Sequence, residues 1–385
     1  MAEVFNDSKV KPIAFYLPQF HEIPENNKFY GEGFTEWTNT KKAKPLFPGH
    51  YQPRIPFGQN YYCLLDEGIM ESQAKLAKEY GIFGFCYYHY WFKDGKKLLE
   101  KPIELMLSND KVDIPFCLCW ANENWSKKWD GGNHEIIVEQ DYGSEDDWDM
   151  HIKYLIPFFK DRRYITLNGK PLFVLYRPEL IPNLKQMMKY WRNKICENGF
   201  SGIIFAIQHP SWYFMTGYNP DLFDYQIKFE PFFSLNYQEK NIDKIRIKQK
   251  IYSLSRCLFL DKFVDIVIEQ YKKRKEKIDI NDLKKTNYDE LWSTVLKTPI
   301  TPKTIEGAFV DWDNTARKKN GMVCLGATPE KFEKNMKSLG ERVKKEASNP
   351  IIFINAWNEW AEAAYLEPDE KYGFEYLQAL KNAIS

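Results

Sequence analysis

Short apolar segments alternate along this chain with longer amphipathic ones. The short segments are rich in Ile, Val, Phe and Tyr and predict buried strands at residues 13–18, 83–89, 115–120, 171–176, 202–208, 225–229, 308–312 and 351–357. The longer segments carry apolar residues at helical spacing beside charged faces, as in 68–80, 147–159, 184–197 and 329–347. Repeated strand–helix units of this number are the parts of a (β/α)8 TIM barrel, so we expect an α/β fold of this type.

Two connections between the predicted strands are unusually long. Residues 19–66 follow the first strand and contain many Pro, Gly, Asn and aromatic residues, which indicates a long first βα loop that serves in binding. Residues 232–300 contain Lys- and Arg-rich helical sequence and predict a helical insertion between strands six and seven, either a lid or a subdomain. We interpret its basic runs as a solvated helix face. The expected organisation is a single domain over residues 1–385 that contains this insertion.

The composition narrows the classes of partner. The 385 residues include 54 Lys and Arg against 53 Asp and Glu, and this balance does not favour nucleic acid or an anionic membrane surface. A transmembrane segment and a secretory signal are not evident, and we expect a cytoplasmic protein. The seven cysteines are irregularly spaced and lack a Cys-x-x-Cys pair, which suits reduced core thiols.

Aromatic residues are abundant, with 12 Trp, 24 Tyr and 27 Phe making 16% of the chain. Any one of them could simply fill the core of a large domain. Many, however, lie beside amides and charged residues at the ends of predicted strands, where their faces could stack on the C–H faces of sugar rings. The pattern therefore favours an oligosaccharide or polysaccharide substrate.

The carboxyl ends of the strands in a parallel barrel meet at one face, and functional residues gather there. Almost every predicted strand end here carries an amide, acid, His or indole. The candidate substrate-binding residues are Tyr16, Gln19, His21, Glu36, Trp37, Tyr88, His89, Trp91, Trp120, Asn122, Glu123, Asn124, Trp125, Trp129, Asp130, Arg177, Gln208, His209, Glu230, Asp311, Trp312, Asn314, Trp357, Asn358 and Trp360. A two-histidine metal site at His89 and His209 lacks a supporting motif, so we expect neither metal nor cofactor.

Glu359 and Glu362 follow the last predicted strand and are the candidate catalytic residues. Two carboxyl groups on one side of a turn suit acid and base catalysis on one glycosidic bond. The neighbouring indoles of Trp357 and Trp360 would raise the pKa of whichever acid they shield from water. The alternative is a structural ion pair of one glutamate with Arg177, Lys127 or Lys128.

Five motifs together resemble one protein family over residues 12–382. They are IAFYLPQFH at 13–21, GFTEWT at 33–38, WANENW at 120–125, DWDNT at 311–315 and NAWNEWAE at 355–362. These motifs are similar to those of WbsX-type proteins, a glycosyltransferase-like group from bacterial O-antigen and capsule gene clusters that is related to glycoside hydrolase family 99.

The resemblance implies a (β/α)8 barrel and retaining, endo-acting chemistry on α-mannosides. In that chemistry the 2-hydroxyl of the substrate attacks and gives a 1,2-anhydro sugar. The resemblance assigns the base for that hydroxyl to Glu359 and the general acid/base to Glu362. The chain departs from the family pattern at Ala363, where Gly commonly follows the second Glu, and at Ala316, where Pro commonly follows the DWDNT motif.

The direction of the chemistry is left open by these residues. A Gly-rich phosphate loop and a Rossmann fingerprint are not found, although Asp311-Trp312-Asp313 is similar to the Asp-x-Asp motif of some nucleotide-sugar transferases. The favoured hypothesis is a glycosidase or transglycosylase that acts on a bacterial surface polysaccharide or its lipid-linked precursor. The alternatives are a nucleotide-sugar-dependent transferase and a noncatalytic glycan-binding barrel.

Overall fold

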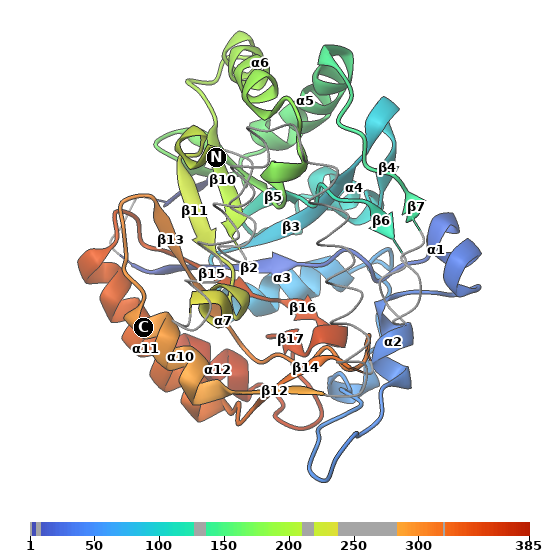
Figure 1. Ribbon diagram of the computed structural model, residues 1–385, viewed down its shortest axis with the longest axis vertical. Helices are drawn as coiled ribbons and strands as arrows, with labels where there is room; N and C mark the ends of the chain where they lie inside the picture. Colours follow the sequence, from blue (N-terminus) through green and yellow to red (C-terminus); the bar gives the residue numbers. More distant parts are fainter. Residues whose placement is uncertain (1, 5–8, 127–135, 210–218, 238–282, 319) are drawn as a thin grey trace, which may run out of the picture.

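The computed structural model describes residues 2–4, 9–126, 136–209, 219–237, 283–318 and 320–385. Its centre is a closed barrel of parallel strands, which Figure 1 shows surrounded by helices. In spatial order the strands are β2 (Lys11–Tyr16), β3 (Gly84–Trp91), β5 (Phe116–Trp120), β9 (Lys170–Leu175), β10 (Ile204–His209), β11 (Tyr225–Lys228), β13 (Thr304–Phe309) and β15 (Ile351–Asn355). The barrel closes because β15 pairs with β2 in parallel. The predicted (β/α)8 fold is confirmed.

The seventh strand begins four residues before its predicted start, at Thr304 instead of residue 308. Two residues interrupt the apolar pattern there. Glu306 is buried and forms an ion pair with Lys228 of β11 at 2.6 Å. A Cβ at Gly307 would lie 1.7 Å from the carbonyl oxygen of Lys228, so only glycine fits at this position. Both exceptions to the apolar pattern therefore come from contacts with the neighbouring strand.

Amphipathic helices cover the outside of the barrel. They are α3 (Ile69–Glu79), α4 (Lys101–Ser108), α5 (Glu145–Lys160), α6 (Leu184–Glu197), α10 (Tyr288–Lys297), α11 (Pro329–Glu346) and α12 (Glu375–Ile384). Helices α5 and α11 begin with side-chain caps: Ser144 and Asp147 form a capping box at α5, and Thr328 accepts the backbone N–H of Lys331 at α11. No helix in the described part of the chain is long and apolar enough to span a bilayer.

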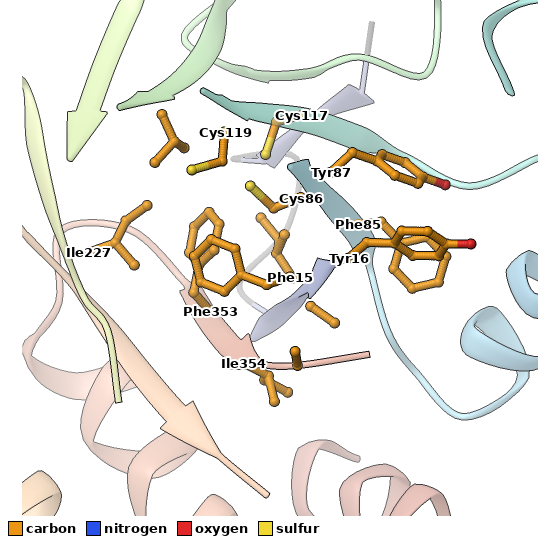
Figure 2. Packing of buried hydrophobic residues seen from close by; sticks show 14 of the residues in the cluster. Phe15, Tyr16, Phe85, Cys86, Tyr87, Cys117, Cys119, Ile227, Phe353 and Ile354 are labelled. Atoms are coloured by element: carbon orange, nitrogen blue, oxygen red, sulfur yellow. The ribbon is translucent and has the colours of Figure 1, made fainter. Parts of the chain in front are cut away.

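The interior of the barrel is filled by large side chains. Figure 2 shows Phe15 and Phe353 in the space enclosed by the strands, with the thiols of Cys86, Cys117 and Cys119 beside them. The ring centroids of Phe15 and Phe353 are 5.3 Å apart. These three cysteines are buried and reduced. The interior of the barrel is therefore filled with side chains, and a cavity within the ring of strands can form only at the ends of the strands.

Alternate residues of each strand point out of the barrel. Tyr16, Phe85 and Tyr87 lie on this outer side in Figure 2, and the rings of Tyr16 and Tyr87 have centroids 4.4 Å apart. The Tyr16 hydroxyl donates to Gln73 of α3 at 2.6 Å. Position along a strand thus decides whether a polar aromatic residue faces the barrel interior or a helix.

The first long loop runs from β2 to α3 and contains α1 (Pro24–Tyr30), α2 (Glu36–Lys42) and the short helix η2 (Phe57–Gln59). Of the predicted insertion, the structure describes α7 (Phe232–Tyr237), β12 (Lys284–Asn287) and α10, while residues 238–282 lie outside the described part. Trp292 of α10 stacks on Phe309 of β13 at 5.4 Å, so this helix is one of the barrel helices. Short strands complete the structure: β1 (Ala2–Glu3), β4 (Lys97–Leu98), β6 (Trp125–Ser126), β7 (Ile136–Val138), β8 (Ile165–Leu167), β14 (Met322–Leu325), β16 (Asn358–Glu359) and β17 (Ala364–Tyr365).

Candidate functional site

A cavity of about 430 Å³ opens at the carboxyl ends of the barrel strands. Residues at or beyond the ends of all eight strands contribute to its wall. The lining consists of Leu17, Gln19, Tyr88, Tyr90, Ala121, Glu123, Asn124, Trp125, Ser126, Tyr176, Arg177, Gln208, Phe229, Phe232, Trp312, Asn314, Arg317, Lys318, Glu359 and Glu362. Aromatic rings, amides and charged groups therefore surround a space large enough for sugar residues.

The segment that follows β15 is fixed to the barrel before it reaches the glutamates. The Asn358 side chain accepts the backbone N–H of Leu17 at 2.7 Å and donates to the carbonyl of Leu17 at 3.0 Å. These two hydrogen bonds to Leu17, the residue after β2, set the position of Glu359, the next residue along the chain. A short helix, η8 (Trp360–Glu362), then brings Glu362 to the cavity and ends at Ala363, whose φ is 54°.

One guanidinium holds both candidate catalytic residues. Arg317 donates from Nη2 to Glu359 at 3.1 Å and to Glu36 at 2.6 Å, and from Nη1 to Glu362. The Glu36 side chain is fully buried and also accepts the backbone N–H of Ala361 at 3.1 Å. The side chains of Glu359 and Glu362 are 9% and 20% exposed. Glu359 and Glu362 can therefore contact a ligand in the cavity. The buried Glu36 instead holds Arg317 and the backbone of Ala361 in place.

The electrostatics of this cluster favour retention of a proton. Burial raises the pKa of Glu359 well above its usual range, the nearby charge of Glu362 raises it further, and Arg317 opposes both effects. Burial also raises the pKa of Glu362, again opposed by Arg317. Three carboxylates around one guanidinium would leave excess negative charge in a buried site. The pair can thus present one protonated and one ionised carboxyl group, which is the requirement for combined acid and base catalysis.

A second charged group forms the opposite wall. Arg177 lies after β9, donates from Nη1 to Glu123 at 3.3 Å and forms a short ion pair with Glu179. Asn122 fixes the Arg177 backbone by accepting its N–H and donating to its carbonyl, each at 2.7 Å. Asn124 similarly accepts the backbone N–H of Gln140 at 2.7 Å. The amides of the WANENW motif therefore serve largely to shape this wall.

The two aspartates of the DWDNT motif bind the first long loop. Asp311 pairs with Arg54 at 2.8 Å. Asp313 accepts from His50 Nε2 at 2.7 Å and from Gln52 Nε2 at 2.8 Å. Both aspartates are buried and lie outside the cavity lining. Their contacts fix the segment that carries Arg317.

Eleven of the residues predicted from the sequence line the cavity: Gln19, Tyr88, Glu123, Asn124, Trp125, Arg177, Gln208, Trp312, Asn314, Glu359 and Glu362. The other described ones lie outside the lining of this cavity: Tyr16, His21, Glu36, Trp37, His89, Trp91, Trp120, Asn122, His209, Glu230, Asp311, Trp357, Asn358 and Trp360. Trp129 and Asp130 lie outside the described residues.

Strand alternation explains much of this division. Tyr88 and Tyr90 face the cavity, so His89 and Trp91 of the same strand face outward. There they pack against His151 of α5: the two histidine Nε2 atoms are 2.8 Å apart, and the Trp91 ring stacks on His151 at 4.6 Å. Burial lowers the pKa of His89 to about 3. Among the described residues, no group of three or more His, Cys, Asp or Glu side chains could hold a metal ion.

Other predicted residues that lie outside the cavity lining form hydrogen bonds within the protein. His21 contacts the carbonyl of Pro18 at 3.1 Å, and Trp37 donates to the carbonyl of Tyr62 at 2.8 Å. Glu230 accepts from the Ser234 hydroxyl at 2.9 Å. These side chains bind loop and helix groups of the protein, and their assignment as substrate contacts stays a prediction.

The sequence analysis missed six cavity residues that could contribute to binding or catalysis: Tyr90, Tyr176, Phe229, Phe232, Arg317 and Lys318. Tyr90 could have been found from strand alternation, since it lies two residues beyond Tyr88. Arg317 gives no such signal, because it lies in a loop well beyond its strand. The alternative ion pair of a catalytic glutamate with Arg177 is not present, because Arg177 pairs with Glu123 and Glu179. Lys127 and Lys128 lie outside the described residues.

Solved structures with a similar fold include the GH99 endo-alpha-mannosidase from Bacteroides thetaiotaomicron, with a TM-score of 0.51 and 13% identity over 98% of this chain and 96% of that one. A glycoside hydrolase-like protein gives a TM-score of 0.54 and 12% identity over 98% and 95% of the two chains. At these identities the likeness concerns the fold alone.

Two further comparisons concern the sequence. The uncharacterized protein WxcX of Xanthomonas campestris pv. campestris is 34% identical over 382 residues, which cover 97% of this chain and 49% of WxcX. The chain thus spans about half the length of the curated relatives it matches. The family model described as glycosyltransferase WbsX matches residues 12–380. On this match the chain belongs to the WbsX glycosyltransferase family.

Proposed function

We propose that this protein acts on a glycosidic bond of a bacterial surface polysaccharide, an O-antigen or capsule, or of its free or lipid-linked precursor. The reaction is hydrolysis or transglycosylation with retention of configuration. One observation carries the proposal: Glu359 and Glu362 line the same cavity and share the guanidinium of Arg317. A buried pair of carboxyl groups with raised pKa values suits proton transfer to and from sugar oxygens.

The two glutamates take different roles in this proposal. In the first step Glu359 accepts the proton of the substrate 2-hydroxyl as its oxygen attacks C1. The bond from C1 to the leaving oxygen breaks, and Glu362 gives its proton to that oxygen. In the second step Glu362 takes a proton from water or an acceptor hydroxyl that opens the 1,2-anhydro ring at C1, and Glu359 returns its proton to O2. The greater exposure of Glu362 supports its role toward the leaving group and the incoming hydroxyl.

Isosteric variants test the roles. Replacement Glu359→Gln or Glu362→Gln should reduce turnover of the cognate surface glycan by at least about a hundredfold, because each removes a proton-transfer group. Products would be read by mass spectrometry, and glycan binding by calorimetry. Glu341→Gln on the outer face of α11 is the matched control and should retain full turnover. Undiminished turnover in both cavity variants would refute the assignment.

The family description favours a second candidate, transfer from a nucleotide sugar. Calorimetry with a panel of nucleotide sugars, with and without Mn²⁺, separates the two. The glycosidase proposal expects heat of binding from oligosaccharides alone. Tight Mn²⁺-dependent binding of a nucleotide sugar would favour the transferase, and glycan binding with no turnover in either assay would favour a noncatalytic barrel.

A further inference from the structure

A second cavity, of about 200 Å³, lies beside the turn that carries Glu359 and Glu362. Its wall includes Trp360, which directly follows Glu359, and the aromatic rings of Phe57, Tyr62 and Phe374. Phe57 and Phe374 are 50% and 39% exposed, and their ring centroids are 5.3 Å apart. Large aromatic side chains that remain this exposed at the edge of a cavity suggest a site with an occupant.

Among the described residues that line this second cavity, the one with a carboxyl group is Glu367, which is only 8% exposed. It accepts hydrogen bonds from Tyr62 Oη at 2.9 Å, Gln73 Nε2 at 2.7 Å and Trp360 Nε1 at 2.7 Å. All three donors are neutral. In the described part of the chain Glu367 has no ion pair.

Some of the other buried carboxylates in the described part of the chain have a cation beside them, whereas Glu230 and Asp369 accept hydrogen bonds from neutral groups. Glu306 pairs with Lys228, and Asp311 pairs with Arg54. A buried carboxylate without a counterion is unfavourable, and its charge is offset when a cation enters. Aromatic faces add to the attraction, because their electron density favours a positive charge.

We propose that the second cavity is a binding site for a small organic ammonium ion, held by the Glu367 carboxylate and the surrounding aromatic rings. Among the described residues, those that line the cavity include no Lys, Arg or His side chain that would oppose a cation. An ammonium ion bears alkyl groups that fit the apolar part of the wall. An amino group on a sugar and a free alkylamine share this chemistry.

Cation binding in this cavity should depend on pH, because protonation of Glu367 removes its negative charge. Burial raises the pKa of Glu367 to about 7. The titratable groups that face it are the phenols of Tyr62 and Tyr16, whose pKa values burial raises well above their usual range, so neither loses its proton near neutral pH. A cation binds the ionised form, which increases about tenfold between pH 6 and pH 8 for such a pKa. The affinity should rise by about the same factor.

The test compares tetramethylammonium chloride with tert-butanol, a neutral probe of similar shape, by calorimetry on the full chain at pH 8, with sodium chloride at matched ionic strength. Tetramethylammonium should bind, and tert-butanol should bind at least about tenfold more weakly. Glu367→Gln keeps the shape and should weaken tetramethylammonium binding at least about tenfold. Glu375→Gln, an exposed neighbour outside the cavity, is the matched control and should not change the affinity.

Phe374→Leu provides a second variant that leaves the buried hydrogen bonds in place. It should weaken tetramethylammonium binding several-fold through loss of an aromatic face. Equal binding of the two probes, unchanged affinity in Glu367→Gln, or no tetramethylammonium binding at pH 8 would each overturn the proposal. The test needs no knowledge of the glycan substrate, so it stands apart from the proposal for the catalytic cavity.

Discussion

Replacement of Arg317 by Gln should destabilise the protein strongly at high pH and weakly at low pH. The variant keeps hydrogen-bonding capacity but removes the positive charge between Glu36, Glu359 and Glu362. At an effective dielectric constant of about 20, opposite charges about 3 Å apart attract by roughly 5 kcal/mol, and desolvation offsets part of this. Removal of one partner of a buried pair costs about 3–5 kcal/mol, which is the expected loss at pH 8.

The pH dependence follows from the direction of the pKa shifts. Burial already raises the pKa values of Glu359 and Glu362 above those of the unfolded chain, and removal of Arg317 raises them further. When the pKa of a carboxyl group is higher in the folded protein than in the unfolded chain, the free energy of unfolding falls as the pH rises above the unfolded-state pKa, which is about 4.3 for Glu. The variant should therefore lose more stability than the wild type between pH 5 and pH 8.

Denaturant unfolding of both proteins at pH 5 and pH 8 measures this difference. Arg162→Gln is the control, because Arg162 forms an exposed pair with Asp113 at 3.4 Å, and such pairs contribute about 0–1 kcal/mol. Addition of Glu359→Gln to the Arg317→Gln variant should restore part of the loss at pH 8. An equal loss at both pH values, or a loss below about 1 kcal/mol at pH 8, would refute the electrostatic explanation.

Two further predictions concern the segments that hold the site. Asp313→Asn should lower the free energy of unfolding by about 1–3 kcal/mol, measured by denaturant unfolding, because His50 and Gln52 both donate to this carboxylate; no change would contradict its role as an anchor. Ala363→Gly should cost at least about 1 kcal/mol less than Ala361→Gly in the same assay, since both alanines are buried but only Ala363 has a left-handed φ of 54°. Equal losses in the two variants would contradict this explanation.

The fold could be predicted from the sequence because parallel strands buried on both faces appear as nearly continuous apolar segments. The exception is β13, which contains Glu306 and Gly307. Both residues are required by contacts with Lys228 of the neighbouring strand β11. Glu359 and Glu362 could be identified because they directly follow a buried strand. Arg317 could not, because its position depends on contacts of Asp311 and Asp313 with a loop more than two hundred residues away in sequence.

Strand ends identified the right face of the barrel, but the choice of side chain on each strand depended on register. His89 and Trp91 illustrate this, since one residue of displacement along β3 separates the cavity from the helix layer. The five sequence motifs therefore mark the position of the site more reliably than they mark which side chain enters it.

Glu36 connects the first long loop to the turn that carries Glu359 and Glu362, because it binds both Arg317 and the backbone of Ala361. The loop therefore cannot change independently of the site during divergence. A relative that lost this acid would have one negative charge fewer around the arginine, and the carboxyl groups equivalent to Glu359 and Glu362 would titrate differently. Chimaeras that exchange residues 19–66 between relatives with and without this acid should inherit the pH response of the loop donor, so a loop distant in sequence would set the acid–base behaviour of the cavity.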